Sequence, residues 1–521
     1  MQSKTKNLTL VRKIFPLVLV FVLAAFIYGQ YGLDDELSRT TAANLYAGQK
    51  MAEGVPPYVS IFDVLGPLGP MLAGLGVMIS EQLGWGDIYT ARLLFLIIGC
   101  FAVASVYLLG EGLFRSQRVG MFAALTFLGF FWFGKEIARG PYQKVPMVLF
   151  VVLSLLLTSR RRWFWAGLCG SLSFLVWQPT AIFPLTTLFV AALQPRQRRL
   201  AAVTRVSAGI GLPLATVGAY FYYHGAFYKL LDGAILFHIL YGERGQSSLL
   251  SHFLTPIQGA FDGFTTMFLP ILLGFVMLAC LYFSRWVRHG SLRNMLAEDA
   301  FAPILLSLPA VVVWSLIDFQ NQKDFLVLLP YAALGFGAFL DLAVRRMGDL
   351  QVGATPLGGM QSLLTVGLCV SLVALALANT SFGSQANELR QGLNQQKEEI
   401  ADIEDRFGSD VKLISIDAPE VLVLQHRTNP TPYAFIVMGI DNHIDANVPG
   451  GFEGWVRELE AYDPDVIALR RSEDGTSVNL GVAGARKQEL MNWLDSNYHL
   501  ERAGAQGHGG WPLYVRNTIE R

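Results

Sequence analysis

The sequence predicts a polytopic α-helical membrane protein with about eleven transmembrane helices, followed by a small C-terminal α/β domain. Three observations predict this fold class. Of the 521 residues, 53% are hydrophobic and only 15% are charged, whereas soluble domains are nearer a quarter charged. Apolar runs recur through residues 1–378, and charge rises over residues 379–521. The formal net charge is zero, so the composition gives no reason to expect a nucleic acid partner.

A transmembrane helix needs about 20 apolar residues. The predicted spans have apolar cores at residues 14–32, 88–114, 119–133, 145–158, 163–176, 181–193, 206–222, 264–283, 301–317, 325–342 and 363–378. Several cores are shorter than a full span and must include flanking residues. The first follows a basic cluster but has no small-residue cleavage site, so we expect it to remain as an anchor.

Segment 66–83 decides the topology, because it is apolar but rich in Gly and Pro. Cytoplasmic loops of membrane proteins are enriched in Lys and Arg. If this segment does not span, the N-terminus and the basic loops 115–118, 160–162, 196–199, 285–293 and 345–346 all face the cytoplasm. We therefore place it as a juxtamembrane helix at the outer interface of the plasma (inner) membrane. The C-terminal domain is then extracytoplasmic.

Residues 379–521 alternate short apolar runs with polar, helix-like stretches. We predict helices at 388–407 and 488–498, and strands at 412–417, 421–425, 433–437 and 466–469. This alternation is typical of a small α/β domain. No nucleotide-binding glycine loop is present in it, and the four cysteines of the chain show no metal-ligand spacing.

Three carboxylates, Asp34, Asp35 and Glu36, directly follow the first predicted span, at the start of outer loop 33–87. An aspartate inside a bilayer costs roughly 2.5–3.5 kcal/mol at a helix centre, and acidic residues at such a boundary often mark function. The structural alternative is that Asp34 or Asp35 caps a helix beginning near Leu37. Both can hold for different members of the trio.

Three further groups are predicted to lie on the same outer face. In the stretch 58–70, Tyr58 and Asp63 belong to a structured loop, where Asp63 either contacts substrate or forms a turn. Lys135, Glu136 and Arg139 combine a carboxylate that can bind a hydroxyl with cations that can bind phosphate; the alternative is a charged interfacial loop with snorkelling side chains. In 320–324, Lys323 either meets a lipid phosphate or belongs to a polar connector.

These residues resemble a known family. The first outer loop is similar to that of the GT-C superfamily of integral membrane glycosyltransferases, especially bacterial relatives of protein mannosyltransferases and lipid A aminoarabinose transferases. The shared pattern is an acidic pair, a polar helix, a small-residue–Pro–Tyr turn and an aromatic–Asp–x–x–Gly–Pro stretch, here Asp35-Glu36, 41–53, 54–58 and 62–67. The match is most specific over 14–152 and thinner to 378. The sequence departs from the pattern in having an acidic trio and in carrying Lys323-Asp324 where a His-Tyr pair is common.

The resemblance implies an inverting hexosyl- or pentosyltransferase that moves a sugar from a polyprenyl-phosphate donor to a lipid, glycan or protein hydroxyl on the extracytoplasmic face. Asp35 is then the base, with Asp34 or Glu36 as alternates. The substrate-binding residues implied are Tyr58, Asp63, Glu136, Lys135, Arg139 and Lys323, the last three on the lipid phosphate. No cofactor is required, although a divalent cation, Mg²⁺ or Mn²⁺, stays open without an evident ligand set.

Two other functions fit the same class of membrane protein. One is a ligase or polymerase that uses a polyprenyl-diphosphate-linked glycan. The other is a transporter or flippase of lipid-linked sugars, which predicts inverted repeats with broken spans in matching positions. We find no such repeat, and the charged residues gather in the outer loops.

Overall fold

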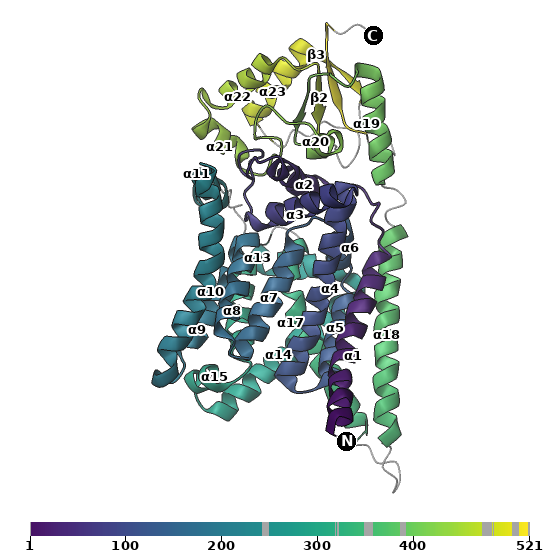
Figure 1. Ribbon diagram of the computed structural model, residues 1–521, viewed down its shortest axis with the longest axis vertical. Helices are drawn as coiled ribbons and strands as arrows, with labels where there is room; N and C mark the ends of the chain where they lie inside the picture. The colour runs from purple at the N-terminus through teal and green to yellow at the C-terminus, as the bar shows by residue number, and fades with distance from the viewer. Residues whose placement is uncertain are drawn as a thin grey trace.

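The chain forms a long bundle of helices with a small α/β domain at one end (Figure 1). The computed structural model describes residues 2–241, 249–317, 319, 322–348, 358–385, 392–470, 482, 484–502 and 510–518. The long helices of the bundle are α1 (Gln2–Gly29), α4 (Asp87–Phe114), α5 (Gln117–Leu128), α7 (Lys144–Ser159), α8 (Trp163–Val176), α9 (Ile182–Ala192), α10 (Arg196–Tyr223), α14 (Phe268–His289), α16 (Ala302–Ile317), α17 (Leu329–Gly348) and α18 (Gly358–Gln385). Each predicted span core therefore overlaps one of these helices.

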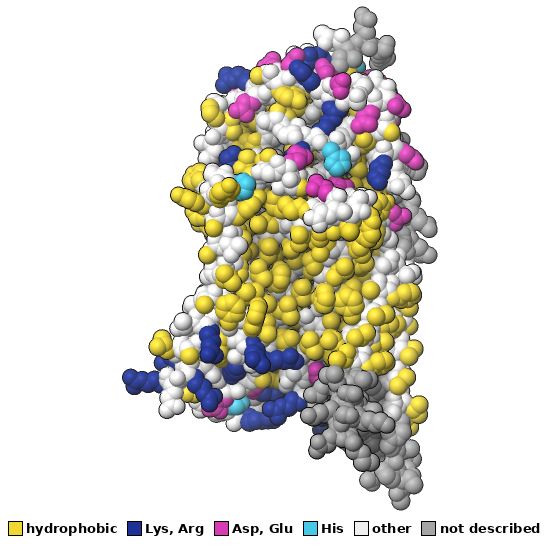
Figure 2. Space-filling model, viewed as in Figure 1, with side chains coloured by type: hydrophobic (Ala, Val, Ile, Leu, Met, Phe, Trp, Pro, Cys, Tyr) yellow, Lys and Arg dark blue, Asp and Glu magenta, His cyan; other side chains and the backbone are white. Residues whose placement is uncertain are grey.

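The number of transmembrane spans stays a prediction. Among the described residues, four helices are long and apolar enough to cross a membrane, or five if the bent pair α5 and α6 (Phe131–Arg139) forms one span. Five shorter apolar helices accompany them. Figure 2 shows a broad band of hydrophobic side chains across the face of the bundle in view, with Lys and Arg gathered near the ends of α9, α10 and α15 (Leu292–Glu298).

A break between α5 and α6 shapes the end of the bundle nearest the C-terminal domain. The two helices meet at 64° around Gly129, where the Asn379 side chain donates to the Gly129 carbonyl at 2.8 Å. The residues that follow the predicted span 119–133 are helical up to Arg139, because α6 continues to that residue. Their position on the outer face stays a prediction. Gly134 lets α6 approach α1, since a Cβ there would lie 3.0 Å from the ring of Tyr28 in α1 and 2.6 Å from the ring of Tyr31, which follows α1.

The outer loop after α1 is largely helical. It contains α2 (Arg39–Ala52) and α3 (Leu68–Leu83), which lie between the bundle and the C-terminal domain (Figure 1). The helix predicted at 66–83 is confirmed as α3, while its position at a membrane interface stays a prediction. The connection between the predicted spans 206–222 and 264–283 also contains helices: α11 (Phe227–Leu231), the π-helix Asp232–Leu236, α12 (Phe237–Leu240) and α13 (Leu249–Phe264).

The C-terminal domain is built on a four-stranded sheet in the order β1-β2-β4-β3. The strands β1 (Leu413–Ile416) and β2 (Val466–Leu469) are parallel, whereas β4 (Leu513–Arg516) runs antiparallel to β2 and to β3 (Tyr498–Arg502). The helices of this domain are α19 (Leu393–Phe407), α20 (Pro419–Gln425), α21 (Ile440–Asn447), α22 (Gly451–Tyr462) and α23 (Gly484–Asn497). An α/β domain is therefore present, and its extracytoplasmic side stays a prediction.

Two of the predicted strands in this domain were wrong. Residues 421–425 belong to α20, which starts at Pro419, a residue well suited to a first helical turn. Residues 433–437 form no strand. There, the Ile436 N–H donates to Asp417 and the Ile436 carbonyl accepts from Arg39. Side chains therefore form the hydrogen bonds with this backbone that a neighbouring strand would form in a sheet. The start of the predicted helix 388–407 lies partly outside the described residues.

Candidate functional site

The acidic segment, residues 33–38, has no regular secondary structure and connects the end of α1 to α2. Its backbone is held by Arg92, a fully buried residue of α4. The Arg92 guanidinium donates to the carbonyls of Leu33 at 2.6 Å, Asp35 at 2.8 Å and Glu36 at 3.1 Å. Three carbonyls that lack a helix or sheet partner are thus satisfied by one side chain, which fixes the path of the segment.

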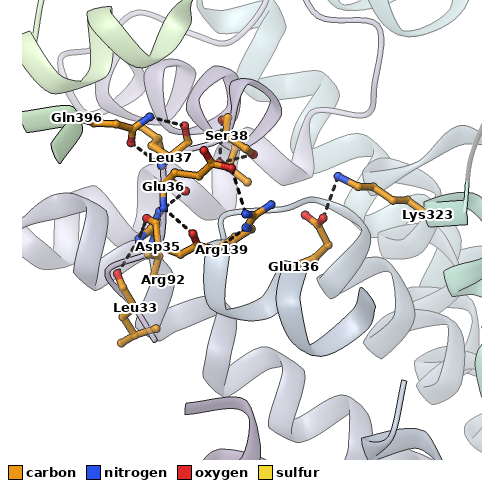
Figure 3. Close-up of polar contacts among 11 residues, drawn as sticks. Leu33, Asp35, Glu36, Leu37, Ser38, Arg92, Glu136, Arg139, Lys323 and Gln396 are labelled. Atoms are coloured by element: carbon orange, nitrogen blue, oxygen red, sulfur yellow. Dashed lines mark hydrogen bonds and ion pairs between the residues drawn. The ribbon is translucent and has the colours of Figure 1, made fainter. Parts of the chain in front are cut away.

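Arg139, the last residue of α6, contacts two members of the acidic trio (Figure 3). Its Nε lies 2.5 Å from the Asp35 carboxylate, and its Nη2 lies 3.1 Å from Glu36. The Asp35 carboxylate also accepts the Glu36 N–H at 2.8 Å. The Asp35 side chain is 8% exposed and that of Glu36 20%, whereas Asp34 is exposed. Asp35 is therefore the most buried carboxylate of the three.

Glu136 lies one turn before Arg139 on α6, so the two side chains are neighbours on the helix surface. It is 1% exposed and pairs with Lys323 Nζ at 2.8 Å. Lys323 comes from the short 3-10 helix Gln322–Val327 and packs over the Tyr142 ring at 4.9 Å. Figure 3 shows this pair and the acidic segment on either side of Arg139. Helix α6 thus joins two charged groups that are far apart in sequence.

Two more lysines are buried close in sequence to these groups. Lys135 lies over the rings of Phe131 and Trp132, at 5.2 and 5.4 Å. Lys144, at the start of α7, pairs with Asp324 and lies 4.5 Å from the Trp177 ring centre. Lys323 is also within 5.7 Å of the Trp132 ring centre. Cations, carboxylates and aromatic faces therefore gather at the bundle end that faces the C-terminal domain, a composition suited to a phosphorylated, hydroxyl-rich ligand.

The structure gives Tyr58 and Asp63 structural partners in another part of the outer loop. Asp63 is buried and its Oδ1 accepts the N–H groups of Val64 and Leu65 at 2.7 and 3.1 Å. Burial raises the pKa of Asp63, while these two N–H donors oppose the rise. The Tyr58 hydroxyl donates to the Leu65 carbonyl. Both side chains thus shape the turn before α3, and their predicted contact with substrate stays a prediction.

We expect Asp63→Ala to destabilise the protein by about 1–3 kcal/mol, because two buried N–H groups lose their acceptor. Asp63→Asn keeps an oxygen acceptor and is expected to lose less. The thermal unfolding midpoints of the two variants in detergent provide the measurement. A stable Asp63→Asn protein with a raised substrate KM would instead favour a direct contact with substrate.

Sequence reasoning missed two side chains of this site. Arg92 could have been found, because it lies inside the predicted apolar span 88–114, and charges within apolar runs are rare and usually functional. Lys144 lies at the edge of the predicted span 145–158. A lysine at such a position is equally well explained by snorkelling, without any role in a site. Within the described part of the chain, no group of three or more His, Cys, Asp or Glu side chains is placed to hold a metal ion.

The comparisons with known proteins agree on the fold. The structure matches crystal structures of ArnT from Cupriavidus metallidurans, one bound to undecaprenyl phosphate and one in the apo state. The match to the bound form covers 97% of this chain and 98% of ArnT, with a TM-score of 0.57 and 13% identity. The chain has the ArnT fold. For the apo form the coverage is 98% of each chain, the TM-score 0.58 and the identity 12%.

No family model and no curated protein matches the chain by sequence. The match to ArnT therefore concerns the fold, and it confirms the predicted GT-C resemblance at that level. Because the alignment spans both chains almost completely, it includes the helical bundle and the C-terminal domain.

Proposed function

We propose that this chain is an integral membrane glycosyltransferase that takes a sugar from a polyprenyl-phosphate donor. Its main support is the ArnT fold over nearly the whole chain, in a comparison protein that was crystallised with undecaprenyl phosphate. The cluster of Asp35, Arg139, Glu136 and the partly exposed Lys323 supports the same proposal, because it combines a carboxylate base with cations for a phosphate. The acceptor is a lipid, glycan or protein hydroxyl at the extracytoplasmic face of the inner membrane.

In the proposed reaction, the Asp35 carboxylate removes the proton of the acceptor hydroxyl. The acceptor oxygen forms a bond to the anomeric carbon as the bond from that carbon to the phosphate oxygen breaks. Attack from the opposite face inverts the anomeric centre, and the polyprenyl phosphate leaves with both bonding electrons. Stabilising the charge that develops on this phosphate is the largest expected contribution of the site.

We propose roles for the surrounding side chains on the basis of their contacts. Arg139 pairs with the carboxylates of Asp35 and Glu36. We therefore assign it two roles, orienting Asp35 and binding the phosphate of the donor. Lys323 and Lys135 complete the phosphate-binding group, while Glu136 binds a hydroxyl of the sugar or acceptor. Asp34 and Glu36 remain alternates for the base. The reaction as proposed needs no cofactor, and an activity assay with and without a chelator tests whether Mg²⁺ or Mn²⁺ takes part.

The proposal is tested by sugar transfer with purified protein in detergent. The donors are a panel of radiolabelled polyprenyl-phosphate sugars, and a membrane extract supplies acceptors. Label entering a new product establishes the reaction class and the donor. If no monophosphate donor works, the glycosyltransferase proposal in this form fails, and polyprenyl-diphosphate donors and transport assays are the next measurements.

We expect Lys323→Met to raise the KM for the donor about 10- to 100-fold, since a hydrogen bond to a charged group contributes about 1.5–3 kcal/mol. In the double variant with Glu136→Gln no unpaired buried charge is left behind, so comparing the unfolding midpoints of the single and double variants shows how much of the effect of Lys323→Met comes from lost stability. Lys412→Met, at an exposed lysine of the C-terminal domain, serves as the control. An unchanged donor KM in Lys323→Met would contradict the assignment to the phosphate.

A further inference from the structure

The C-terminal domain contacts the acidic segment directly, in addition to the contacts that Arg92 of the bundle makes with it. Gln396, from α19, is 2% exposed and forms two hydrogen bonds with a single residue of the segment. Its Oε1 accepts the Leu37 N–H at 2.7 Å, and its Nε2 donates to the Leu37 carbonyl at 3.2 Å. One side-chain amide thus pairs with both backbone groups of Leu37, as a neighbouring strand would.

The first residue of α19 adds a third contact. The Leu393 N–H donates to the Asp34 carbonyl at 2.8 Å. Leu393 and Leu37 are both buried in the same apolar cluster, so the N-terminal end of α19 packs on the segment as well as bonding to it. Asp35 and Glu36 lie between the two points of contact, Asp34 and Leu37. The backbone on each side of the proposed base is therefore fixed by the C-terminal domain.

A second connection lies directly after the segment. Arg39, the first residue of α2, donates to both Asp417 carboxylate oxygens at 2.5 and 2.6 Å, and to the Ile436 carbonyl at 2.8 Å. Asp417 follows β1, is fully buried and is also reached by Arg470, which follows β2, at 3.5 Å. The carboxyl ends of the two parallel strands thus hold the start of α2.

We propose that the C-terminal domain is a positioning element of the active site, in which Gln396 acts through Leu37 and Asp417 acts through Arg39 to place the Asp35 carboxylate. This inference rests on the proposed function for its catalytic meaning. A segment without helix or strand bonds takes its geometry from the side chains that hold it. Displacing a reacting group by about 1 Å can cost on the order of 100-fold in rate, so contacts remote from the substrate can set kcat.

The test is Gln396→Met, which keeps the side-chain volume and removes both hydrogen bonds to Leu37. Its matched control is Asn394→Ala, at an exposed position of the same helix. We expect Gln396→Met to lower kcat per folded protein about 10- to 100-fold, with the donor KM within a factor of about three of wild type. Arg39→Met removes the ion pair between α2 and Asp417 of the C-terminal domain, and we expect it to lower kcat as well.

Hydrogen–deuterium exchange over residues 33–39 gives a readout that does not depend on activity. We expect faster exchange of this peptide in Gln396→Met than in wild type or Asn394→Ala. Wild-type kcat in Gln396→Met, a raised donor KM with unchanged kcat, or unchanged exchange would each overturn the positioning role. If wild-type protein transfers no sugar, the proposed function fails, and the exchange measurement still decides whether the C-terminal domain holds the segment.

Discussion

Asp35→Asn is expected to lower kcat for sugar transfer by about 10²- to 10⁴-fold, the contribution typical of a general base. Arg139 donates to Oδ2 of Asp35 and the Glu36 N–H donates to Oδ1, so the single oxygen of the asparagine can keep one of these two hydrogen bonds. The size and shape of the side chain are unchanged, and the protein should still insert and fold. What it loses is the ability to take the acceptor proton. The measurement is the transfer rate of purified protein, normalised to the amount that elutes as a single species in detergent.

The neighbouring carboxylates provide the controls for this result. Asp34 is exposed, and Glu36 is more exposed than Asp35, so Asp34→Asn and Glu36→Gln should keep most of the activity. Full activity in Asp35→Asn would reject it as the base. If one of the other two variants is inactive in its place, the base is that residue and the reaction class still stands.

Arg139→Leu is expected to have the second largest effect, because it removes the partner of two carboxylates at once. Removing one partner of a buried ion pair costs about 3–5 kcal/mol, and the partial exposure of Glu36 places this case toward the lower end. Activity should fall as well, since Asp35 loses the donor that orients it. The thermal unfolding midpoint and the transfer rate per folded protein measure the two effects separately.

Arg118 offers a matched comparison within the same bundle. It pairs with Asp341 of α17 at 2.9 Å. Neither residue belongs to the charged cluster at the bundle end that faces the C-terminal domain. We expect Arg118→Leu to lower the unfolding midpoint while the rate per folded protein stays at the wild-type value. Arg139→Lys keeps the charge but not the forked geometry, so its rate should be intermediate. A wild-type rate in Arg139→Leu would limit this arginine to a structural role.

The bundle was largely predictable from the sequence because the physical requirement is local. A membrane helix satisfies its own backbone and needs only a long enough apolar run, and each predicted core overlaps a helix. The position of the acidic segment followed for the same reason, since it directly adjoins the first run. Short strands lack such a signal. Residues 421–425 are apolar, but a run of that length does not distinguish a strand from a buried helical turn.

The partners of the charged residues were decided by the tertiary structure. Arg139 lies 104 positions from Asp35, and no local pattern specifies that pair or the pairing of Glu136 with Lys323. The bend before α6 and the close approach at Gly134 bring these groups together. Likewise, nothing in the sequence of α19 marks Gln396 as a contact of Leu37. Which residues could carry the chemistry follows from the sequence alone, because placing charge beside a membrane has a cost. Only the packing of distant helices decided which of them meet, because pair interactions depend on distance in space and not along the chain.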